Sequence, residues 1–261
     1  FKYLDDEHQI IIGKSDAKSD MFDTIIFASR NIQRVTIPKN IKCIKGHAFD
    51  NCKQLKSVEF QKDSELAKIN NFAFCDSSLE SIIIPKSVSK IGNGAFFSCK
   101  NLQKVSIEEG SKLQSLANDS FFSCEKLEEV YIPENSSLRV IGENAFNLSS
   151  IESLFIPKSV EIIEDGIFKF SEIKKIIISP LNQNFKYLDE KHQIVVGKRN
   201  NKGKIFDTII FADRNIEQAT IPKFIKFIYD GAFMNCKKLK RIDIPDDSEI
   251  ESIGYCAFKS T

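Results

Sequence analysis

The chain has 261 residues, with 37 basic and 36 acidic side chains and a formal net charge of +1 at pH 7. Because the two signs are mixed along the chain, this balance argues against nucleic acid as the main partner and against a polybasic membrane-binding patch. No apolar run approaches the roughly 18 residues that a membrane-spanning helix needs, and no signal peptide is recognisable.

The chain opens with a segment, residues 1–30, that we expect to form a β-hairpin insert. A second copy of this segment occurs later, because Phe1–Phe60 matches Phe185–Ile244 at a constant offset of 184. We place the second insert at residues 181–216. Its strands are predicted at His192–Val196 and Phe206–Phe211, joined by a polar turn at Gly197–Lys204.

The rest of the chain repeats a unit about every 23 residues, which reads I-P-x-x-V-x-x-I-x-x-x-A-F-x-x-C-x-x-L-x-x-V. Residues 84–107 are one copy. A fixed period of this length indicates a solenoid, in which one supersecondary unit stacks on copies of itself. Repeat coils are therefore expected at 31–180 and 217–261, and residues 1–261 as a whole are expected to form a single solenoid.

Each unit predicts a short strand followed, on the opposite side, by a single helical or 3-10 turn. Leu102, Val105 and Ile107 alternate as the inward residues of one such strand. Pro85 directly follows another strand and ends its ladder, because proline has no N–H to donate. One phenylalanine recurs at the same place in every unit, so these rings should stack as an internal column. The column consists of Phe49, Phe74, Phe96, Phe121, Phe146, Phe168, Phe233 and Phe258.

Four of the seven cysteines lie three residues after this phenylalanine, namely Cys52, Cys99, Cys124 and Cys236. Serine fills the same place in other units, which indicates a small buried residue, so free thiols are expected. A disulfide between Cys99 and Cys124 stays open as an alternative, since they lie on neighbouring coils. Neither the cysteine spacing nor the scattered histidines, His8, His47 and His192, suits a metal site, and no cofactor is expected.

The sequence shows none of the common catalytic motifs, such as a nucleophile elbow, a P-loop or a dinucleotide fingerprint. Paired carboxylates such as Glu108 and Glu109 sit beside predicted strands, where solvated edges are the usual environment. No nucleophile, base and orienting group are predicted to meet. The chain is therefore expected to have no enzymatic activity.

The signature I-P…I-G…A-F…C…L occurs in at least eight copies, and with the two inserts it resembles the BspA-like, treponemal-type leucine-rich repeat family. That family comprises surface proteins of anaerobic bacteria and mucosal protists, and the resemblance covers essentially the whole chain. It implies an α/β-repeat, leucine-rich-repeat solenoid with a parallel β-sheet face, short helical or 3-10 turns opposite, and two β-hairpin inserts.

The resemblance also implies a function: adhesion to or recognition of host protein, matrix or other cells, at the cell surface or after secretion. The partner would be a protein or glycoprotein. We expect the chain to be a fragment of a longer protein, so that any membrane attachment would need an anchor outside it. An intracellular scaffold for protein–protein interactions is the alternative.

One column of outward positions on the predicted sheet points to a binding surface. Tyr131, Phe155 and Ile177 lie in it on consecutive coils, and contiguous exposed apolar surface usually marks a contact. The predicted partner-binding face consists of these three residues with Ile83, Lys104, Glu129 and Lys175. Two alternatives remain open here: the second insert folds over the patch, or the patch is a contact between copies of the chain.

Three sequons occur, and N-glycosylation is possible at Asn118 and Asn135. The third, at Asn147, is expected to be partly internal because Ser149 lies in the cysteine column.

Overall fold

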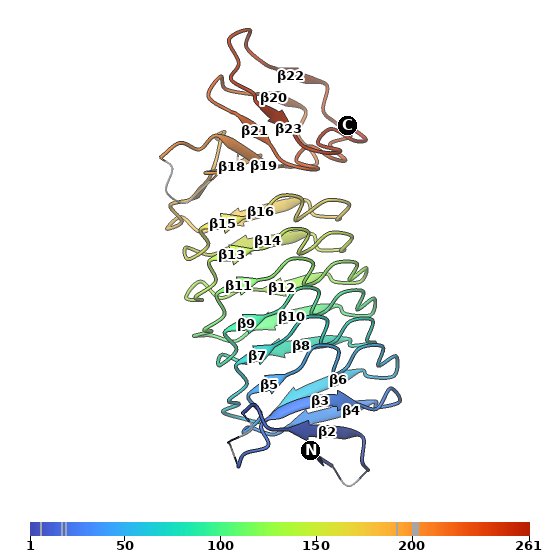
Figure 1. The fold of residues 1–261 in the computed structure, drawn as a ribbon. Coiled ribbons are helices and arrows are strands. Elements are labelled where there is room, and N and C mark those ends of the chain that lie inside the picture. Colours follow the sequence, from blue (N-terminus) through green and yellow to red (C-terminus); the bar gives the residue numbers. More distant parts are fainter. Residues whose placement is uncertain (6, 17, 19, 192, 200–203) are drawn as a thin grey trace.

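The computed structural model describes residues 1–5, 7–16, 18, 20–191, 193–199 and 204–261. These residues form a stack of coils that runs from the N-terminal to the C-terminal end of the chain (Figure 1). A standard coil carries one longer strand and one two-residue strand, and the two sets of strands lie in neighbouring columns (Figure 1). The described residues contain no helix.

The longer strands form one face of the stack, which we call the sheet face. Their bounds are β4 (Arg34–Ile37), β6 (Ser57–Phe60), β8 (Ser81–Ile84), β10 (Lys104–Ile107), β12 (Glu129–Tyr131), β14 (Ser153–Ile156), β16 (Lys175–Ile178), β20 (Gln218–Thr220) and β22 (Arg241–Asp243). They form three parallel sheets, β4–β6–β8–β10–β12, β14–β16 and β20–β22. Ile82, Val105 and Val130 are register partners on successive coils. Residues at equivalent positions of the repeat therefore point to the same side of the sheet.

The two-residue strands form the second column. Their bounds are β5 (Cys43–Ile44), β7 (Lys68–Ile69), β9 (Lys90–Ile91), β11 (Ser115–Leu116), β13 (Val140–Ile141), β15 (Ile162–Ile163), β21 (Phe227–Ile228) and β23 (Ser252–Ile253). Each pairs in parallel with the strand of an adjacent coil within its sheet. In most of these strands the second residue is fully buried, so both columns enclose one apolar core.

The turns opposite the sheet face are not the helical or 3-10 turns that the sequence predicts. Alternate N–H groups bond within the coil and to the next coil: Phe97 donates to the Gly94 carbonyl, and Phe96 to the Ser120 carbonyl, both at 2.9 Å. Gly94 and Ser98 have left-handed backbones, with φ values of 58° and 57°. Because left-handed residues interrupt a right-handed helix, this segment becomes a series of turns that ties neighbouring coils together.

The internal phenylalanine column is confirmed from Phe49 to Phe146, and Phe233 stacks on the partly buried Phe258 at 5.0 Å, whereas Phe168 packs edge-on against Phe211. From Phe49 through Phe74, Phe96 and Phe121 to Phe146, successive ring centroids are 4.9, 5.2, 5.2 and 5.7 Å apart, and the rings are nearly parallel. All five side chains are fully buried. Stacked rings at this spacing add to the free energy that burial of their area already provides.

All seven cysteines are free thiols, which is what the interchange with serine predicts for the four of the cysteine column, and the alternative disulfide between Cys99 and Cys124 is absent. The Cys99 thiol donates to the Phe74 carbonyl at 3.0 Å, and the Cys124 thiol to the Phe96 carbonyl at 3.1 Å. Each thiol therefore bonds back to the preceding coil. Burial raises the pKa of the Cys124 thiol, which makes it an inert packing group.

Each insert contains three antiparallel strands, one more than the sequence predicts. Their bounds are β1 (Lys2–Tyr3), β2 (Ile10–Gly13) and β3 (Thr24–Ala28), then β17 (Phe185–Tyr187), β18 (Ile194–Gly197) and β19 (Thr208–Ala212). β18 and β19 begin two residues later than predicted, while His192 and 200–203 lie outside the described residues. β3 and β19 continue into the stack by pairing in parallel with β5 and β21.

The second insert separates two hydrophobic cores. Val195, Ile210 and Phe211 pack into the core of the preceding coils, whereas Ile194 and Val196 pack into the core of the following coils. Successive side chains of a strand point to opposite faces, and here both faces are apolar. The insert therefore acts as a partition across the stack, in line with its place between the lower and upper parts of Figure 1.

Candidate partner-binding face

The structure places the predicted apolar residues in one outward column of the sheet face. Ile83 pairs with Ser106, which pairs with Tyr131, and Phe155 pairs with Ile177. The exposed fraction is 58% for Ile83, 51% for Tyr131 and 41% for Ile177, and Phe155 is half-buried. The column is divided between two sheets, because β12 and β14 do not share a ladder.

The predicted charged rim is largely neutralised. Lys104 Nζ lies 2.6 Å from Glu129 Oε2, on the neighbouring coil. The Tyr131 hydroxyl donates to Glu109 at 2.6 Å, and this hydrogen bond to a carboxylate raises the pKa of Tyr131. Lys175 is exposed at the edge of β16. The face therefore offers apolar side chains with paired charges beside them.

The described residues of the second insert do not fold over this face. They stack on the end of the preceding coil, where the Tyr187 hydroxyl donates to the Ile176 carbonyl at 2.9 Å and accepts from the Ile178 N–H at 3.2 Å. Ile177, the residue between these two, remains 41% exposed. The alternative that the insert covers the patch is therefore wrong for the part of the insert that the structure describes.

A hollow that the sequence did not reveal opens beside Ile83. It has a volume of about 390 Å³ and is lined by the apolar residues Val58, Phe60, Ile82, Ile83 and Pro85, with Glu59 and Glu108 among its polar residues. The hollow lies where β6 and β8 share a single register pair, Ser57 with Ser81. Both this place and the break between β12 and β14 follow a 24-residue repeat step, from Phe60 to Ile84 and from Ile132 to Ile156.

A row of rings on the opposite side of the stack, made of the exposed His47 and three partly buried phenylalanines, was also missed. His47 stacks on Phe72 at 5.4 Å, Phe72 lies 6.4 Å from Phe97, and Phe97 stacks on Phe122 at 5.0 Å. On this side of the repeat, the sequence predicts phenylalanine only in the internal column. The second phenylalanine of Phe96-Phe97 and of Phe121-Phe122 was the available signal.

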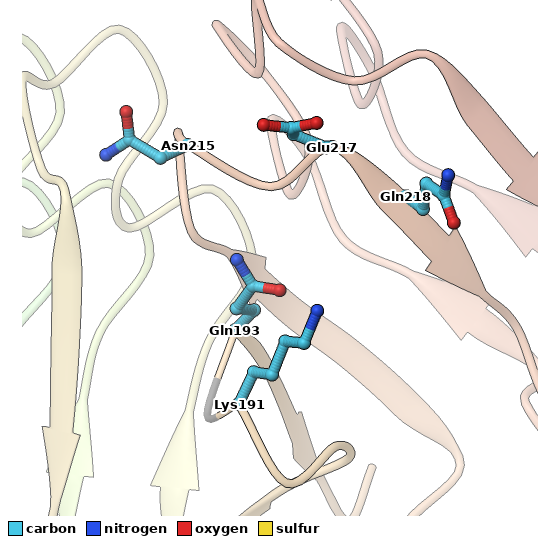
Figure 2. A pocket seen from close by; sticks show the side chains of 5 residues that line it. All are labelled: Lys191, Gln193, Asn215, Glu217 and Gln218. Atoms are coloured by element: carbon cyan, nitrogen blue, oxygen red, sulfur yellow. The ribbon is translucent and has the colours of Figure 1, made fainter.

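A polar pocket of about 420 Å³ lies beside the second insert. Figure 2 shows Lys191 and Gln193 lining it from the segment before β18, Asn215 and Glu217 from the segment that leads into β20, and Gln218 from β20 itself. Glu217 also pairs with Lys240 at 3.2 Å. The described lining residues are amides and one charge of each sign, which suits hydrogen bonding, and no nucleophile–base pair is found among them.

Groups for other chemistry do not converge in the described part of the chain. No cluster of three or more His, Cys, Asp or Glu side chains there could hold a metal ion. His8 packs against the Tyr3 ring, whereas His47 lies 3.2 Å from Asp50 at another coil. Among the same residues, no helix is long and apolar enough to cross a membrane.

The three sequons differ in access. Asn118 Oδ1 accepts the Glu143 N–H at 3.2 Å, and Ser120 of the same sequon is fully buried. Asn135 is exposed, and its Oδ1 accepts from Lys158 at 3.1 Å. Asn147 is 4% exposed, as expected for an internal sequon. Asn135 thus offers the most accessible side chain for the predicted glycosylation.

Comparison with known proteins gives a clear relationship. The sequence profile of the BspA type leucine-rich repeat region matches in six copies, over residues 21–137, 105–191 and 200–261. No curated protein matches the chain. Among solved structures, the pneumococcal vaccine antigen PcpA is 25% identical, with a TM-score of 0.60 over 95% of this chain and 51% of its own.

A leucine-rich repeat protein of Eubacterium ventriosum has a TM-score of 0.62 at 23% identity, over 79% of this chain and 51% of its own. The chain thus spans about half the length of both of these proteins. The similarity to the Eubacterium ventriosum protein shows a shared fold.

Proposed function

This chain belongs to the BspA-type leucine-rich repeat family, and we propose that it is a non-enzymatic recognition protein that binds a protein or glycoprotein of a host surface, matrix or another cell through its sheet face. The observation that carries the proposal is the open apolar column. Ile83, Tyr131 and Ile177 are each more than 40% exposed although they lie on ordered parallel strands. Soluble proteins rarely leave such a column uncovered without a partner.

The charges around the column favour an apolar contact with a polar rim. Lys104 and Glu129 neutralise each other, and the Tyr131 hydroxyl is held by Glu109. A fixed aromatic ring with a tethered hydroxyl loses little conformational freedom on binding, which is typical of residues that contribute most at interfaces. A long repeat array would add avidity by presenting several such contacts at once.

We propose that the protein acts at the cell surface or after secretion, as one solenoid within a longer chain. The family supports this location, and so does the likeness to PcpA, a pneumococcal vaccine antigen. An antibody against the chain should label intact, unpermeabilised source cells. Labelling that requires permeabilisation would instead favour the alternative, an intracellular scaffold that uses the same face.

The sheet face is tested by substituting Tyr131→Ser and Phe155→Ser together and measuring binding to purified matrix glycoproteins such as fibronectin and laminin. For any glycoprotein that the unchanged chain binds, the affinity of the double variant should be at least about tenfold lower. The control is Ile205→Ser with Phe224→Ser, two exposed apolar residues outside the column, at 58% and 39% exposure. Unchanged binding with reduced stability would show that Tyr131 and Phe155 serve packing.

A further inference from the structure

A second hollow lies on the flank formed by β3, β5 and β7, away from the column of longer strands. It has a volume of about 420 Å³, and its lining includes three lysines, Lys42, Lys45 and Lys68, together with Ser15 and Asn70. Backbone pairing fixes their spacing, because β5 and β7 are neighbours in one ladder and Cys43 is the register partner of Lys68. The ammonium groups are therefore held around one opening by adjacent coils.

These three lysines are not neutralised by carboxylates in the part of the chain that the structure describes. No Asp or Glu there lies within ion-pair distance of any of them, and none lines the hollow. The Asp23 carboxylate lies beneath, buried, with both oxygens engaged by Ser15 and Thr24. It interacts electrostatically with Lys42. The hollow therefore carries an excess of positive charge.

The polar groups around the lysines are already satisfied within the protein. The Ser15 hydroxyl donates to Asp23 at 2.8 Å, and the Asn70 amide donates to the Ile44 carbonyl at 3.1 Å. The ammonium groups are thus the donors left for a ligand. Lys90, the register partner of Lys68 on the following coil, extends the row of positive charge along the stack.

The equivalent place in the second copy, 184 residues later, has different side chains and contacts. Lys226 corresponds to Lys42 and pairs with Glu251 at 3.0 Å, and Tyr229 corresponds to Lys45. The guanidinium of Arg199, which corresponds to Ser15, lies 3.7 Å from the centroid of the Phe227 ring. The repeat itself therefore does not require an open basic hollow. Lys226 keeps the charge of Lys42 but is paired with a carboxylate, and Tyr229 and Ser252 stand where the first copy has Lys45 and Lys68.

We propose that this hollow is a binding site for an acidic glycan, with the lysine ammonium groups contacting its sulfate or carboxylate groups. Charges that follow the stack from coil to coil suit an anionic chain that lies along the flank. The lining contains no aromatic side chain on which a nucleic-acid base could stack. The site is separate from the sheet face and extends the proposed recognition to a second class of ligand.

The test is calorimetric titration with a heparin-derived oligosaccharide at low and at physiological salt. The variant Lys42→Gln/Lys45→Gln/Lys68→Gln should bind at least about tenfold more weakly, and the dependence of its affinity on salt should become shallower, because three cation contacts are lost. The control variant Lys56→Gln/Lys62→Gln/Lys112→Gln removes the same charge from three exposed lysines outside the hollow. It should bind within about twofold of the unchanged chain.

Three outcomes would overturn the proposal. The unchanged chain does not bind the oligosaccharide, or the control variant weakens binding as much as the hollow variant, which would mean a diffuse charge effect. The third is that a single-stranded DNA of equal charge binds equally well and loses binding in the hollow variant, which would assign the site to nucleic acid. The Tyr131→Ser/Phe155→Ser variant should retain glycan binding, so failure of the sheet-face proposal and failure of this one are distinguishable.

Discussion

The two inserts have nearly the same sequence and different surroundings. In the second insert Phe185 and Phe211 are each 2% exposed, because the coil that ends in β16 packs against them. Their counterparts in the first insert, Phe1 and Phe27, are 89% and 40% exposed. In a repeat stack, the burial of a side chain therefore depends on the neighbouring coil as much as on the repeat's own sequence.

The largest expected difference between the inserts is at these phenylalanines. Phe211 packs edge-on against Phe168 at 6.0 Å, within the core of the preceding coils. Phe211→Ala should lower the free energy of unfolding by about 3–5 kcal/mol, because it leaves a cavity. Phe27→Ala removes a ring that is partly in water and should cost less than about 1 kcal/mol.

Urea unfolding of both variants, followed by circular dichroism, measures the two costs. Equal costs would contradict the comparison, since they would mean that Phe27 is as well packed as Phe211.

The next largest effect is expected at the ion pair that bridges the second insert. Lys169 Nζ lies 2.8 Å from Asp230 Oδ2, with side-chain exposures of 18% and 22%, and 5.2 Å from the centre of the Tyr255 ring. In the first copy, Gly46 takes the place of Asp230. Lys169→Met should lower the free energy of unfolding by about 1–3 kcal/mol, because Asp230 is left partly buried without its cation.

The matched control is Lys53→Met, which breaks an exposed pair with Asp76 at 3.0 Å. Its cost should be less than about 1 kcal/mol. Equal midpoints of thermal unfolding for the two variants would show that the bridging pair contributes no more than a surface pair.

A smaller effect is expected at the tyrosine hydroxyls. The Tyr187 hydroxyl makes two hydrogen bonds to the backbone of β16, to Ile176 and Ile178, whereas Tyr3 is 50% exposed. Tyr187→Phe should cost about 1–2 kcal/mol, because it leaves backbone groups without a partner, and Tyr3→Phe should cost close to nothing. Differential scanning calorimetry measures both, and a loss of stability in Tyr3→Phe would contradict the difference in surroundings.

The repeat period was enough to predict the stack, its inward residues and the ring column, because each of these depends on contacts that every coil repeats. The turns opposite the sheet were predicted wrongly. Alternate N–H groups of these turns bond to the next coil, as from Phe96 to Ser120, and the sequence of a single repeat does not show these bonds between coils. The column of Ile83, Tyr131 and Ile177 was found from alternation alone, since side chains alternate across a strand.

The basic hollow and the apolar hollow could not be predicted from the period. The first depends on side chains from an insert and two coils, with Ser15 beside Lys42 and Lys68. The second depends on the loss of pairing between β6 and β8 after Ser57 and Ser81. Both hollows arise where the chain departs from the repeat, and a consensus repeat unit does not contain these departures.

The smallest predicted effect concerns the turn of the first insert and depends on pH. Burial alone would raise the pKa of Asp23, but hydrogen bonds from Ser15 and Thr24 outweigh it, so that the pKa is lowered from its usual value of 3.8. A carboxyl whose folded-state pKa is lowered stabilises the fold above its unfolded-state pKa, and that stabilisation is lost as the pH falls through the folded-state value. Asp23→Asn should therefore lower the free energy of unfolding near neutral pH by less than about 1 kcal/mol. The free energy of unfolding of this variant should also fall less steeply as the pH is lowered into the acid range.

The counterpart in the second insert, Asp207, is the control for this prediction. It accepts from the Arg199 N–H and the Thr208 hydroxyl, at 3.3 and 3.1 Å, where Asp23 accepts from Ser15 through both its N–H and its hydroxyl, at 2.9 and 2.8 Å. Because the hydrogen bonds that it accepts from the described residues Arg199 and Thr208 are longer, Asp207→Asn should lower the unfolding midpoint near neutral pH less than Asp23→Asn does. Thermal unfolding at about pH 6 compares the two variants, and measurements of Asp23→Asn down to about pH 3 follow its acid limb. Equal losses in the two variants would mean that the shorter hydrogen bonds of the first insert add no stability, and that the inserts differ through their neighbouring coils alone.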